Sequence, residues 1–591
     1  MHPALTYPFD GAYILKKRRA IRRELTADES PRQSCRIAIL GGTTTHDIRE
    51  ITELFLLDAG ILPEFYESEY GGWWQEGMFG EELRAFRPDV VFIHTGVRDI
   101  RAWPRLAQGE AGADALAEET MARYEALWDK LGQDLSCAVI SNNFEKPTYR
   151  VLGNRDAWDG AGRGRFISLL NARMGAYARS HPGFYIHDVD YLSSDYGLSA
   201  WQDPKAWHLY KYSMAVEAIP AFAHSLAVLI SAVRGKSKKA LALDLDNTLW
   251  GGVVGDDGPE GIVIGHETSE GQIYSEFQQY LKDLGEAGVL LNVISKNDRE
   301  NALAGIDHPE GTLRREDFVD IIANWEPKGQ NLARLAKTLS ILPESIVFVD
   351  DNPAERLQVH TEFPGVAAPP ADRVEDSIRL IDRAGYFEPA ALSADDLSRG
   401  DMLRQNLARA EQQAKFADYD AYLRDLAMHG EIRPFAPVYM ARIAQLTNKS
   451  NQFNLTTRRF TEPELAALAA DDRYICLYGK LTDRFGDNGV VSVMIGEIVE
   501  DAVHLRLFLM SCRVLKRQME QAMLDRMAAL AAARGANRLV GYYYPTPKNG
   551  MVRELYPSLG FAPAGEDGDG TVWNLPLRGY TCQNNVIEVD G

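Results

Sequence analysis

The stretch ALALDLDNTLW, residues 240–250, decides how the rest of this chain is interpreted. A buried strand over 240–243 is expected to run directly into two carboxylates, Asp244 and Asp246, with Thr248 two residues further on. In open α/β folds, ligands bind beyond the carboxyl ends of the strands. The stretch therefore predicts a place for a metal ion and a phosphate at that edge of a sheet.

The two carboxylates fit a specific chemistry. One can attack phosphorus while the other handles the proton of the leaving group. Two neighbouring carboxylates cannot both stay buried and charged without a cation, which implies Mg²⁺. A lone D-x-D can also be a strand that ends in a solvated acidic turn. Whether this pair is catalytic therefore depends on the chemistry of the later stretches.

Two of these later stretches carry groups that can hold a phosphate. A strand predicted over 289–294 ends at Ser295, whose hydroxyl can bind a phosphate oxygen. A strand predicted over 319–325 is followed by Lys328, which opens a helix and can neutralise phosphate charge. The expected phosphate-binding residues are Thr248, Ser295 and Lys328.

The third stretch completes a metal site. A strand predicted over 345–349 ends at Asp350 and Asp351, oxygen ligands of the kind that Mg²⁺ prefers. Helices expected over 276–287 and 331–340 separate the strands, which is typical of a doubly wound α/β sheet. The expected metal ligands are Asp244, Asp246, Asp350 and Asp351.

Together these motifs resemble the haloacid dehalogenase (HAD) superfamily. More narrowly, three sequence motifs resemble the FkbH-like family: DLDNTLWGGVVGDDG at 244–258, NWEPK at 324–328 and FVDDNP at 348–353. The resemblance implies a HAD-type Rossmann-like domain over about 236–385. Only a small flap, over 250–258, fits between the first strand and the next helix, so the site should stay open to a sizeable substrate.

Composition limits the remaining possibilities. At 591 residues the chain should hold three or four domains, and its net charge of -20 opposes binding to a phosphate backbone, so no nucleic acid partner is expected. The five cysteines contain no C-x-x-C pair, which indicates neither a disulfide framework nor a zinc site. The N-terminus lacks the apolar core of a signal peptide, and no run approaches a membrane span, so we expect a cytoplasmic protein without a membrane partner.

Residues 1–235 are predicted to form an α/β domain, similar to SGNH hydrolases and to flavodoxin-like sheets. Strands are expected over 35–40, 89–93 and 136–140. The resemblance would place Thr43 at the nucleophile, Arg98 near the oxyanion hole, and Asp203 with His208 near the acid and base. A threonine nucleophile is hindered and a charged arginine replaces a neutral amide. We therefore favour a noncatalytic, structural or docking role over an esterase.

Residues 386–591 are predicted to begin with a helical connector, over about 394–415 and 418–426, followed by an α+β domain. Strands are expected over 474–478, 489–495 and 502–509. A strand, a cationic turn and a helix to about residue 533, with a later Leu-Gly-Phe, resemble the GNAT acyltransferase fold. In that fold the turn holds a pyrophosphate through glycines, but Lys516 and Gln518 stand where the glycines would be.

Cys512 is the candidate nucleophile of this last domain. We expect it at the N-terminus of that helix, close to Arg513, Lys516 and Arg517, where a thiol ionises more readily. A small buried residue at the end of a strand is the alternative. The run Ser-Cys-Arg also recurs in FkbH-like proteins, whose resemblance to this chain extends over about 236–575.

The FkbH-like resemblance implies a glyceryl transferase of natural-product (polyketide) biosynthesis. It would dephosphorylate 1,3-bisphosphoglycerate and load a glyceryl or related C3 acyl group onto the phosphopantetheine thiol of an acyl carrier protein. In that scheme we expect Asp244 to be the nucleophile and Asp246 the acid/base of the phosphate hydrolysis. The expected acyl and carrier contacts are Asn451, Arg513, Arg517 and Asn549, with Arg458 and Arg459 as further docking candidates. A simple Mg²⁺-dependent HAD phosphatase of a small metabolite and a noncatalytic docking protein remain the alternatives.

Overall fold

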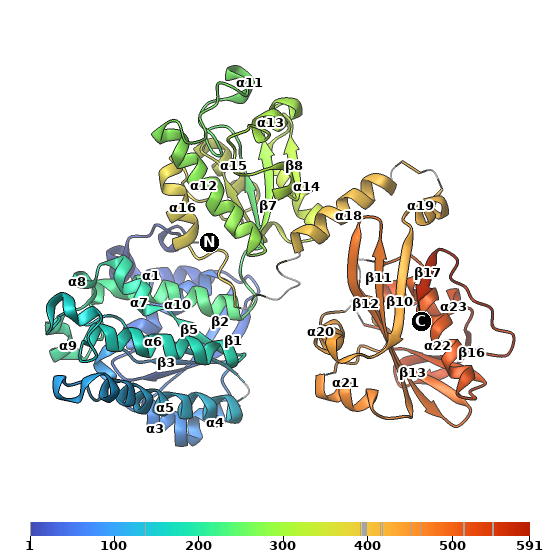
Figure 1. Ribbon diagram of the computed structural model, residues 1–591, viewed down its shortest axis with the longest axis horizontal. Helices are drawn as coiled ribbons and strands as arrows, with labels where there is room; N and C mark the ends of the chain where they lie inside the picture. The colour runs from blue at the N-terminus through green and yellow to red at the C-terminus, as the bar shows by residue number, and fades with distance from the viewer. Residues whose placement is uncertain are drawn as a thin grey trace. The chain divides into compact units, whose positions relative to one another are not determined.

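The computed structural model describes residues 2–135, 137–390, 392, 397, 399–413, 415–416, 418–450, 452–460, 462–511, 514–546 and 549–590. The chain divides into two compact units, Met1–Gly400 and Asp401–Gly591. The first unit contains two parallel sheets and the second one large mixed sheet (Figure 1).

The N-terminal sheet is parallel throughout, with strand order β2-β1-β3-β4-β5. Its strands are β1 (Gln33–Gly41), β2 (Ile61–Glu67), β3 (Val90–His94), β4 (Ala138–Asn142) and β5 (Phe184–His187). Its helices are α1 (Gly11–Ala27), α2 (His46–Asp58), α3 (Trp73–Phe79), α4 (Glu81–Phe86), α5 (Gly109–Leu135), α6 (Arg163–Ser180), α7 (Val189–Tyr196), α8 (Leu198–Trp201), α9 (Pro204–Tyr210) and α10 (Ile219–Val233).

Helices cover both faces of this sheet because its central strands are apolar on both sides. In β1, Ile37 and Ile39 pack with α1, α2 and α10, whereas Ala38 and Leu40 pack with α3, α5 and α6. The three predicted strands are confirmed. The sequence did not indicate β2 and β5, which are the edge strands; β2 contains Pro63, which a strand tolerates at an edge.

One apolar helix of this unit also passes the length and composition test for a membrane span. The window Val216–Val233 has a mean hydropathy of 1.7, and 56% of it is buried inside the protein. The helix α10 within it packs against α2, and Phe222, Leu226 and Ile230 lie in the core of the sheet. Packing in this core accounts for its apolar composition.

The second sheet follows directly, with order β8-β7-β6-β9 and all strands parallel. Its strands are β6 (Ala240–Leu243), β7 (Leu290–Ser295), β8 (Asp320–Ala323) and β9 (Ile346–Val349). Its helices are α11 (Val254–Asp257), α12 (Ser269–Glu286), α13 (Arg299–Ile306), α14 (Lys328–Leu339), α15 (Pro353–Glu362) and α16 (Val374–Arg383). The four predicted strands and the doubly wound arrangement are confirmed.

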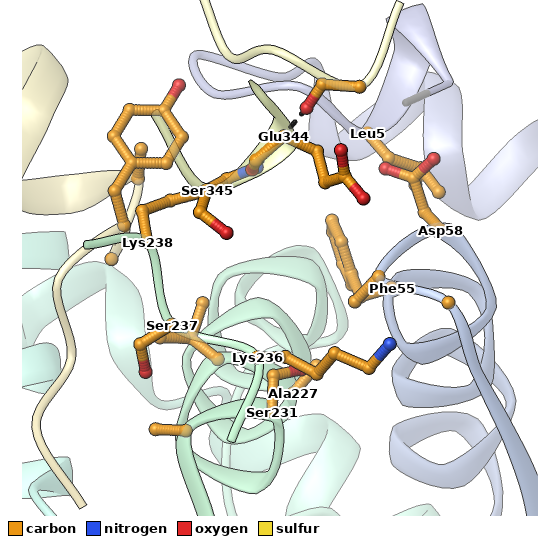
Figure 2. A pocket seen from close by; sticks show the side chains of 18 of the residues that line it. Leu5, Phe55, Asp58, Ala227, Ser231, Lys236, Ser237, Lys238, Glu344 and Ser345 are labelled. Atoms are coloured by element: carbon orange, nitrogen blue, oxygen red, sulfur yellow. Dashed lines mark hydrogen bonds between the residues drawn. The ribbon is translucent and has the colours of Figure 1, made fainter. Parts of the chain in front are cut away.

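A cavity of about 700 Å³ lies where the two sheets of this unit are joined. Its lining includes Phe55 and Asp58 of α2, Glu344, and the linker residues Lys236 and Lys238, which lie on different sides of it (Figure 2). The Lys238 ammonium donates to the Glu344 carbonyl oxygen at 2.6 Å. Burial lowers the pKa of Lys238 to about 8. This contact ties the linker to the second sheet.

The second unit is built on an eight-stranded sheet, with order β15-β16-β14-β13-β12-β11-β10-β17. Neighbouring strands are antiparallel except β13 with β14 and β10 with β17. Its strands are β10 (Met428–Pro434), β11 (Tyr474–Asp483), β12 (Gly486–Val499), β13 (Ala502–Met510), β14 (Arg538–Tyr543), β15 (Ala562–Asp567), β16 (Gly570–Pro576) and β17 (Ile587–Asp590). Its helices are α18 (Arg399–Gln413), which starts just before the unit boundary, α19 (Tyr419–Asp425), α20 (Met440–Lys449), α21 (Glu462–Ala469), α22 (Met519–Ala533) and α23 (Leu555–Ser558).

Candidate active site

The carboxyl edge of the second sheet gathers the predicted functional side chains. Asp244 follows the central strand β6, which pairs with β7 on one side and β9 on the other. Ser295 is the last residue of β7, Asp350 follows β9, and Lys328 is the first residue of α14. The carboxyl ends of parallel strands lie at the same edge of a sheet, so residues that are far apart in the sequence meet there.

Lys328 lies between two carboxylates at the centre of the site. Its ammonium is 2.9 Å from Asp244 Oδ2 and 2.5 Å from Asp350 Oδ2. The lysine side chain is 3% exposed. Burial alone would lower the pKa of Lys328, but the charges of Asp244 and Asp350 outweigh it and raise that pKa. Lys328 is therefore a fixed positive charge.

Three carboxylates of the site can hold one cation. Ligand oxygens of Asp244, Asp350 and Asp351 all lie within 4.8 Å of one another. Asp244 Oδ1 is buried and has no hydrogen-bond partner, as expected of an atom that binds a ligand. The three carboxylates and the single ammonium of Lys328 leave two negative charges, which one divalent cation balances. The all-oxygen set suits Mg²⁺, so the residues present fit this ion.

The pKa of Asp350 determines the pH range in which that cation can bind. Burial, followed by the nearby charge of Asp244, raises the pKa of Asp350 to about 6. Burial also raises the pKa of Asp351. Metal and proton compete for the same oxygens, so the affinity of the site for a cation depends on pH near this value.

The structure separates Asp246 from the predicted metal ligands. Its Oδ1 accepts from Trp250 Nε1 at 3.0 Å and from the Val254 backbone N–H at 3.0 Å, and its Oδ2 accepts from Asn297 Nδ2 at 3.1 Å. The carboxylate thus faces the flap, and it is not part of the metal group found among the described residues. Burial raises the pKa of Asp246 despite these donors, which favours an acid/base role.

The sequence did not indicate that Trp250 and Asn297 would be donors to Asp246. Trp250 is almost fully buried, and its ring lies 2.8 Å from where a Cβ on Gly305 would stand, so only glycine leaves room for it. Asn297 belongs to the Ser-Lys-Asn run after β7, but no role was predicted for it. A short polar run at a strand end is the signal that could have found Asn297; no pattern along the sequence indicates the indole contact.

The loop after β9 is held by a third residue for which the sequence indicated no role. Arg356 of α15 donates to the backbone oxygen of Asp350 at 2.6 Å and to that of Asp351 at 2.9 Å. The Asn352 backbone N–H donates to Asp350 Oδ1 at 2.9 Å. These contacts fix the direction in which the Asp350 carboxylate points.

The two predicted hydroxyl groups also lie at this edge. Thr248 is 5% exposed, and its Oγ1 is buried without a hydrogen-bond partner. Ser295 is 2% exposed. An unpartnered buried hydroxyl near a lysine and a metal group is suited to a phosphate oxygen.

No hydrogen bond in the described part of the chain joins the residues that the SGNH resemblance would place at a catalytic triad, because Thr43 Oγ1 is buried without a partner. Thr43 is 2% exposed, whereas Asp203 and His208 are both exposed on the surface. Asp203 caps α9 by accepting from the Lys205 backbone N–H at 2.8 Å. Arg98, expected near an oxyanion hole, instead stacks over a tryptophan ring at 5.1 Å. The esterase alternative therefore has no geometric support.

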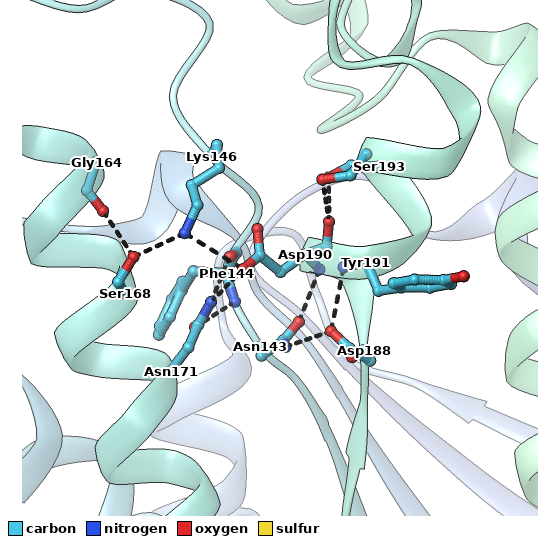
Figure 3. A network of polar contacts seen from close by, with 11 residues as sticks. Asn143, Phe144, Lys146, Gly164, Ser168, Asn171, Asp188, Asp190, Tyr191 and Ser193 are labelled. Carbon is cyan, nitrogen blue, oxygen red and sulfur yellow. Dashed lines mark hydrogen bonds and ion pairs between the residues drawn. The ribbon is translucent and has the colours of Figure 1, made fainter. Parts of the chain in front are cut away.

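Structural hydrogen bonds occupy the loop after β4 in the same sheet (Figure 3). Asn171 of α6 exchanges two bonds with the backbone of Phe144, at 3.0 and 2.8 Å. Lys146 donates to Ser168 Oγ at 2.9 Å and Asn143 to Asp188 Oδ1 at 2.7 Å. These contacts hold the start of the loop against α6 and α7.

Part of the predicted acyl site lies outside the described residues, namely Asn451, Cys512 and Arg513. The helix expected to begin directly after Cys512 begins at Met519 instead. Cys512 precedes the first residue of that helix by seven positions in the sequence, so the helix N-terminus gives no reason for this thiol to ionise. The prediction that this cysteine is a nucleophile stays a prediction.

Two further acyl-site predictions are corrected by burial. Arg517 is 9% exposed, and its Nη1 is 3.2 Å from Asp483 Oδ2, an acid that Arg409 also binds. It cannot dock a partner from the surface. Asn549 is fully buried and donates to the backbone oxygens of Asn454 and Tyr544, both at 3.0 Å. Its role is to join two loops.

The turn before α22 nevertheless has the backbone of a glycine turn. Lys516 and Gln518 adopt φ values of 61° and 62°, the left-handed region that glycine favours. Tyr419 donates to the Lys516 carbonyl oxygen at 3.0 Å, and Gln518 Oε1 accepts from the Asn585 backbone N–H at 3.1 Å. Non-glycine residues in this region cost about 1–2 kcal/mol each, so the surrounding contacts must impose the conformation.

The chain shares its fold with a solved structure that contains a phosphatase domain. That structure is the N-terminal part of a Bacteroides fragilis protein, complexed with Mg; it is 27% identical and the TM-score is 0.58. The match covers 64% of this chain and 99% of that chain. No protein-family model matches, and no curated protein matches.

Lower similarities involve acetyltransferases of the GNAT type. The ribosomal-protein-S18-alanine N-acetyltransferase from Escherichia coli is 17% identical over 25% of this chain and 94% of that chain, with a TM-score of 0.20. The PaiA N-acetyltransferase from Thermoplasma acidophilum, in complex with coenzyme A, is 13% identical over 25% and 98%, with a TM-score of 0.19.

Binding of Mg²⁺ should weaken as the pH falls through about 6, the pKa of Asp350. Above that pH the Asp350 carboxylate is charged and can bind the metal. Below it, a proton competes with the metal for the carboxylate oxygens. Titration calorimetry at pH 5 and pH 8 should show affinities that differ by about tenfold, as one competing proton requires. Asp350→Asn should bind weakly at both pH values, and equal affinities of the unmodified chain would contradict the assignment.

Proposed function

We propose that this protein is a Mg²⁺-dependent phosphatase of the HAD type. The observation that carries the proposal is the unpartnered, buried Oδ1 of Asp244. Asp244 belongs to a group of three carboxylates. The other oxygen of its carboxylate, Oδ2, is 2.9 Å from Lys328 Nζ. The fold shared with a phosphatase-domain protein complexed with Mg supports the same reaction class.

In the first step Asp244 Oδ1 attacks phosphorus. The bond from phosphorus to the leaving oxygen breaks, and that oxygen takes its electron pair and receives a proton from Asp246. Lys328 and the Thr248 hydroxyl hold the phosphoryl oxygens and stabilise the negative charge that they share in the transition state. A bound Mg²⁺, held by Asp244, Asp350 and Asp351, would supply electrostatic stabilisation of the same oxygens.

In the second step water attacks phosphorus of the aspartyl phosphate, and Asp246 takes a proton from that water. The bond from phosphorus to Asp244 Oδ1 breaks, which restores the Asp244 carboxylate and releases phosphate. The same carboxyl thus serves as acid and then as base, which requires it to carry a proton at the start. Burial raises the pKa of Asp246, which favours the protonated carboxyl. Trp250, Val254 and Asn297 donate to its oxygens, and so they set its orientation.

Asp244→Asn should abolish release of phosphate from p-nitrophenyl phosphate, with a decrease in kcat of at least about 10⁴-fold, because an amide cannot act as the nucleophile. The matched control is Asp256→Asn, an exposed acid on α11, which should leave kcat within about twofold of the unmodified chain. Steady-state kinetics with Mg²⁺ measures both variants. Substantial activity of Asp244→Asn would exclude this nucleophile.

We further propose that the phosphatase reaction serves an acyl transfer. Cys512 would attack the C1 carbonyl of 1,3-bisphosphoglycerate; the bond to the C1 phosphate breaks, and phosphate leaves with the electron pair. The phosphopantetheine thiol of a carrier protein then displaces Cys512, and the Asp244 site hydrolyses the C3 phosphate. The glycine-like backbone at Lys516 and Gln518 favours this reading, since it preserves a turn typical of acyltransferases despite its cost.

Intact-protein mass spectrometry after incubation with 1,3-bisphosphoglycerate and Mg²⁺ tests the acyl step. We expect one glyceryl or phosphoglyceryl adduct, mapped to Cys512 and lost in Cys512→Ser. Cys582→Ser, which removes an exposed free thiol, is the matched control and should keep the adduct. Phosphate release without any adduct would leave the simple phosphatase as the function.

A further inference from the structure

Three loops at the carboxyl edge of the N-terminal sheet contain nine Lys and Arg residues against five Asp and Glu residues, although the chain has a net charge of -20. We call residues 95–108, 143–163 and 202–212 the basic loop surface. The first two segments follow the parallel strands β3 and β4, so they lie at the same edge. The third reaches that edge too, because the Lys211 carbonyl oxygen accepts from the Thr44 backbone N–H, just beyond β1, at 3.1 Å.

Most of the positive charge on this surface is not neutralised. In the described part of the chain, Lys146 and Arg155 pair with carboxylates, and the other seven cations of this surface form no ion pair: Arg98, Arg101, Arg105, Arg150, Arg163, Lys205 and Lys211. Of the five acids in the same loops, Glu145 and Asp156 are only 2% and 1% exposed, Asp99 and Asp159 are half-buried, and Asp203 is exposed. With nine cations against five acids, these three loops carry a net positive charge, which attracts an acidic partner.

Large aromatic side chains lie among these cations. Tyr149, Trp158 and Tyr210 are 59%, 65% and 62% exposed. Arg163 stacks on Tyr149 at 4.9 Å and donates to its hydroxyl at 2.5 Å, and Arg155 stacks on Trp158 at 4.8 Å. Tyrosine, tryptophan and arginine are the residues that dominate binding energy at protein interfaces. A merely solvated charged face would not need exposed aromatic rings.

The surface is also ordered before a partner arrives. The contacts of Asn143, Phe144 and Lys146 with α6 and α7 hold the base of the second segment (Figure 3). The stacked arginines limit the rotation of the exposed rings. Side chains that are already ordered lose less entropy on binding.

We propose that the basic loop surface is the docking site for an acidic protein, the phosphopantetheinylated acyl carrier protein that receives the acyl group. The identity of the partner rests on the proposed acyl transfer, whereas the acidic character of the partner follows from the surface itself. This assignment gives the N-terminal sheet a binding role and replaces docking at Arg517, which is buried.

The test is the triple variant Arg98→Glu, Arg101→Glu, Arg105→Glu in the full chain, assayed for acylation of an acidic phosphopantetheinylated carrier protein. Its KM for the carrier should rise at least about tenfold with kcat unchanged, since rim charges act mainly on encounter. The matched control is Lys16→Glu, Lys17→Glu, Arg19→Glu, an equal charge change on exposed residues of α1, which should change KM by less than twofold. Both variants should release phosphate from p-nitrophenyl phosphate at the normal rate, which shows that they are folded.

Each other outcome contradicts part of the account. An equal rise in KM for both variants, or a rise for neither, overturns the docking surface and leaves the proposed function intact. If the unmodified chain acylates no carrier, the acyl transfer is wrong, and titration calorimetry with the carrier then decides docking alone. Binding of a short DNA duplex as tight as that of the carrier would overturn the choice of partner. If the triple variant does not fold, the double variant Arg150→Glu, Lys205→Glu replaces it with the same expected rise.

Discussion

The ammonium of Lys328, buried between Asp244 and Asp350, is the interaction on which the candidate active site depends. A buried charge is costly unless it is paired, and here two carboxylates offset that cost at 2.9 and 2.5 Å. The pairing draws the ends of β6 and β9 to the start of α14. It also leaves Asp244 Oδ1 without a partner, so the same contact that stabilises the site keeps the nucleophilic oxygen free.

The sequence predicted this edge because its signals are local. Each strand of the second sheet is a short apolar run that stops at a polar residue, and parallel strands bring such stops together. Asp246 was predicted correctly to lie at this edge, but the sequence could not indicate that Trp250 and Asn297 turn it away from the metal group, since both contacts depend on tertiary packing. Burial of Arg517 and Asn549 was unpredictable for the same reason: polar residues in a polar loop suggest a surface.

The two parallel sheets of the first unit use the same edge in different ways. In the second sheet the strand ends carry unpartnered oxygens around Lys328. In the N-terminal sheet, Thr43 Oγ1 has no hydrogen-bond partner, Asp203 caps α9, and hydrogen bonds to the backbone fix the loop after β4. Open α/β sheets bind ligands at this edge, and exposed Arg and Tyr residues on rigid loops suit a protein partner better than a small substrate.

The central claim is that Asp244 is phosphorylated during turnover. Rapid acid quenching of the full chain with Mg²⁺ and p-nitrophenyl phosphate, followed by peptide mass spectrometry, measures this directly. The account predicts one phosphoryl group on the peptide that contains Asp244, labile to base and absent in Asp244→Asn. A phosphoryl group on another residue, or product formation with no phosphorylated protein at any quench time, would contradict it.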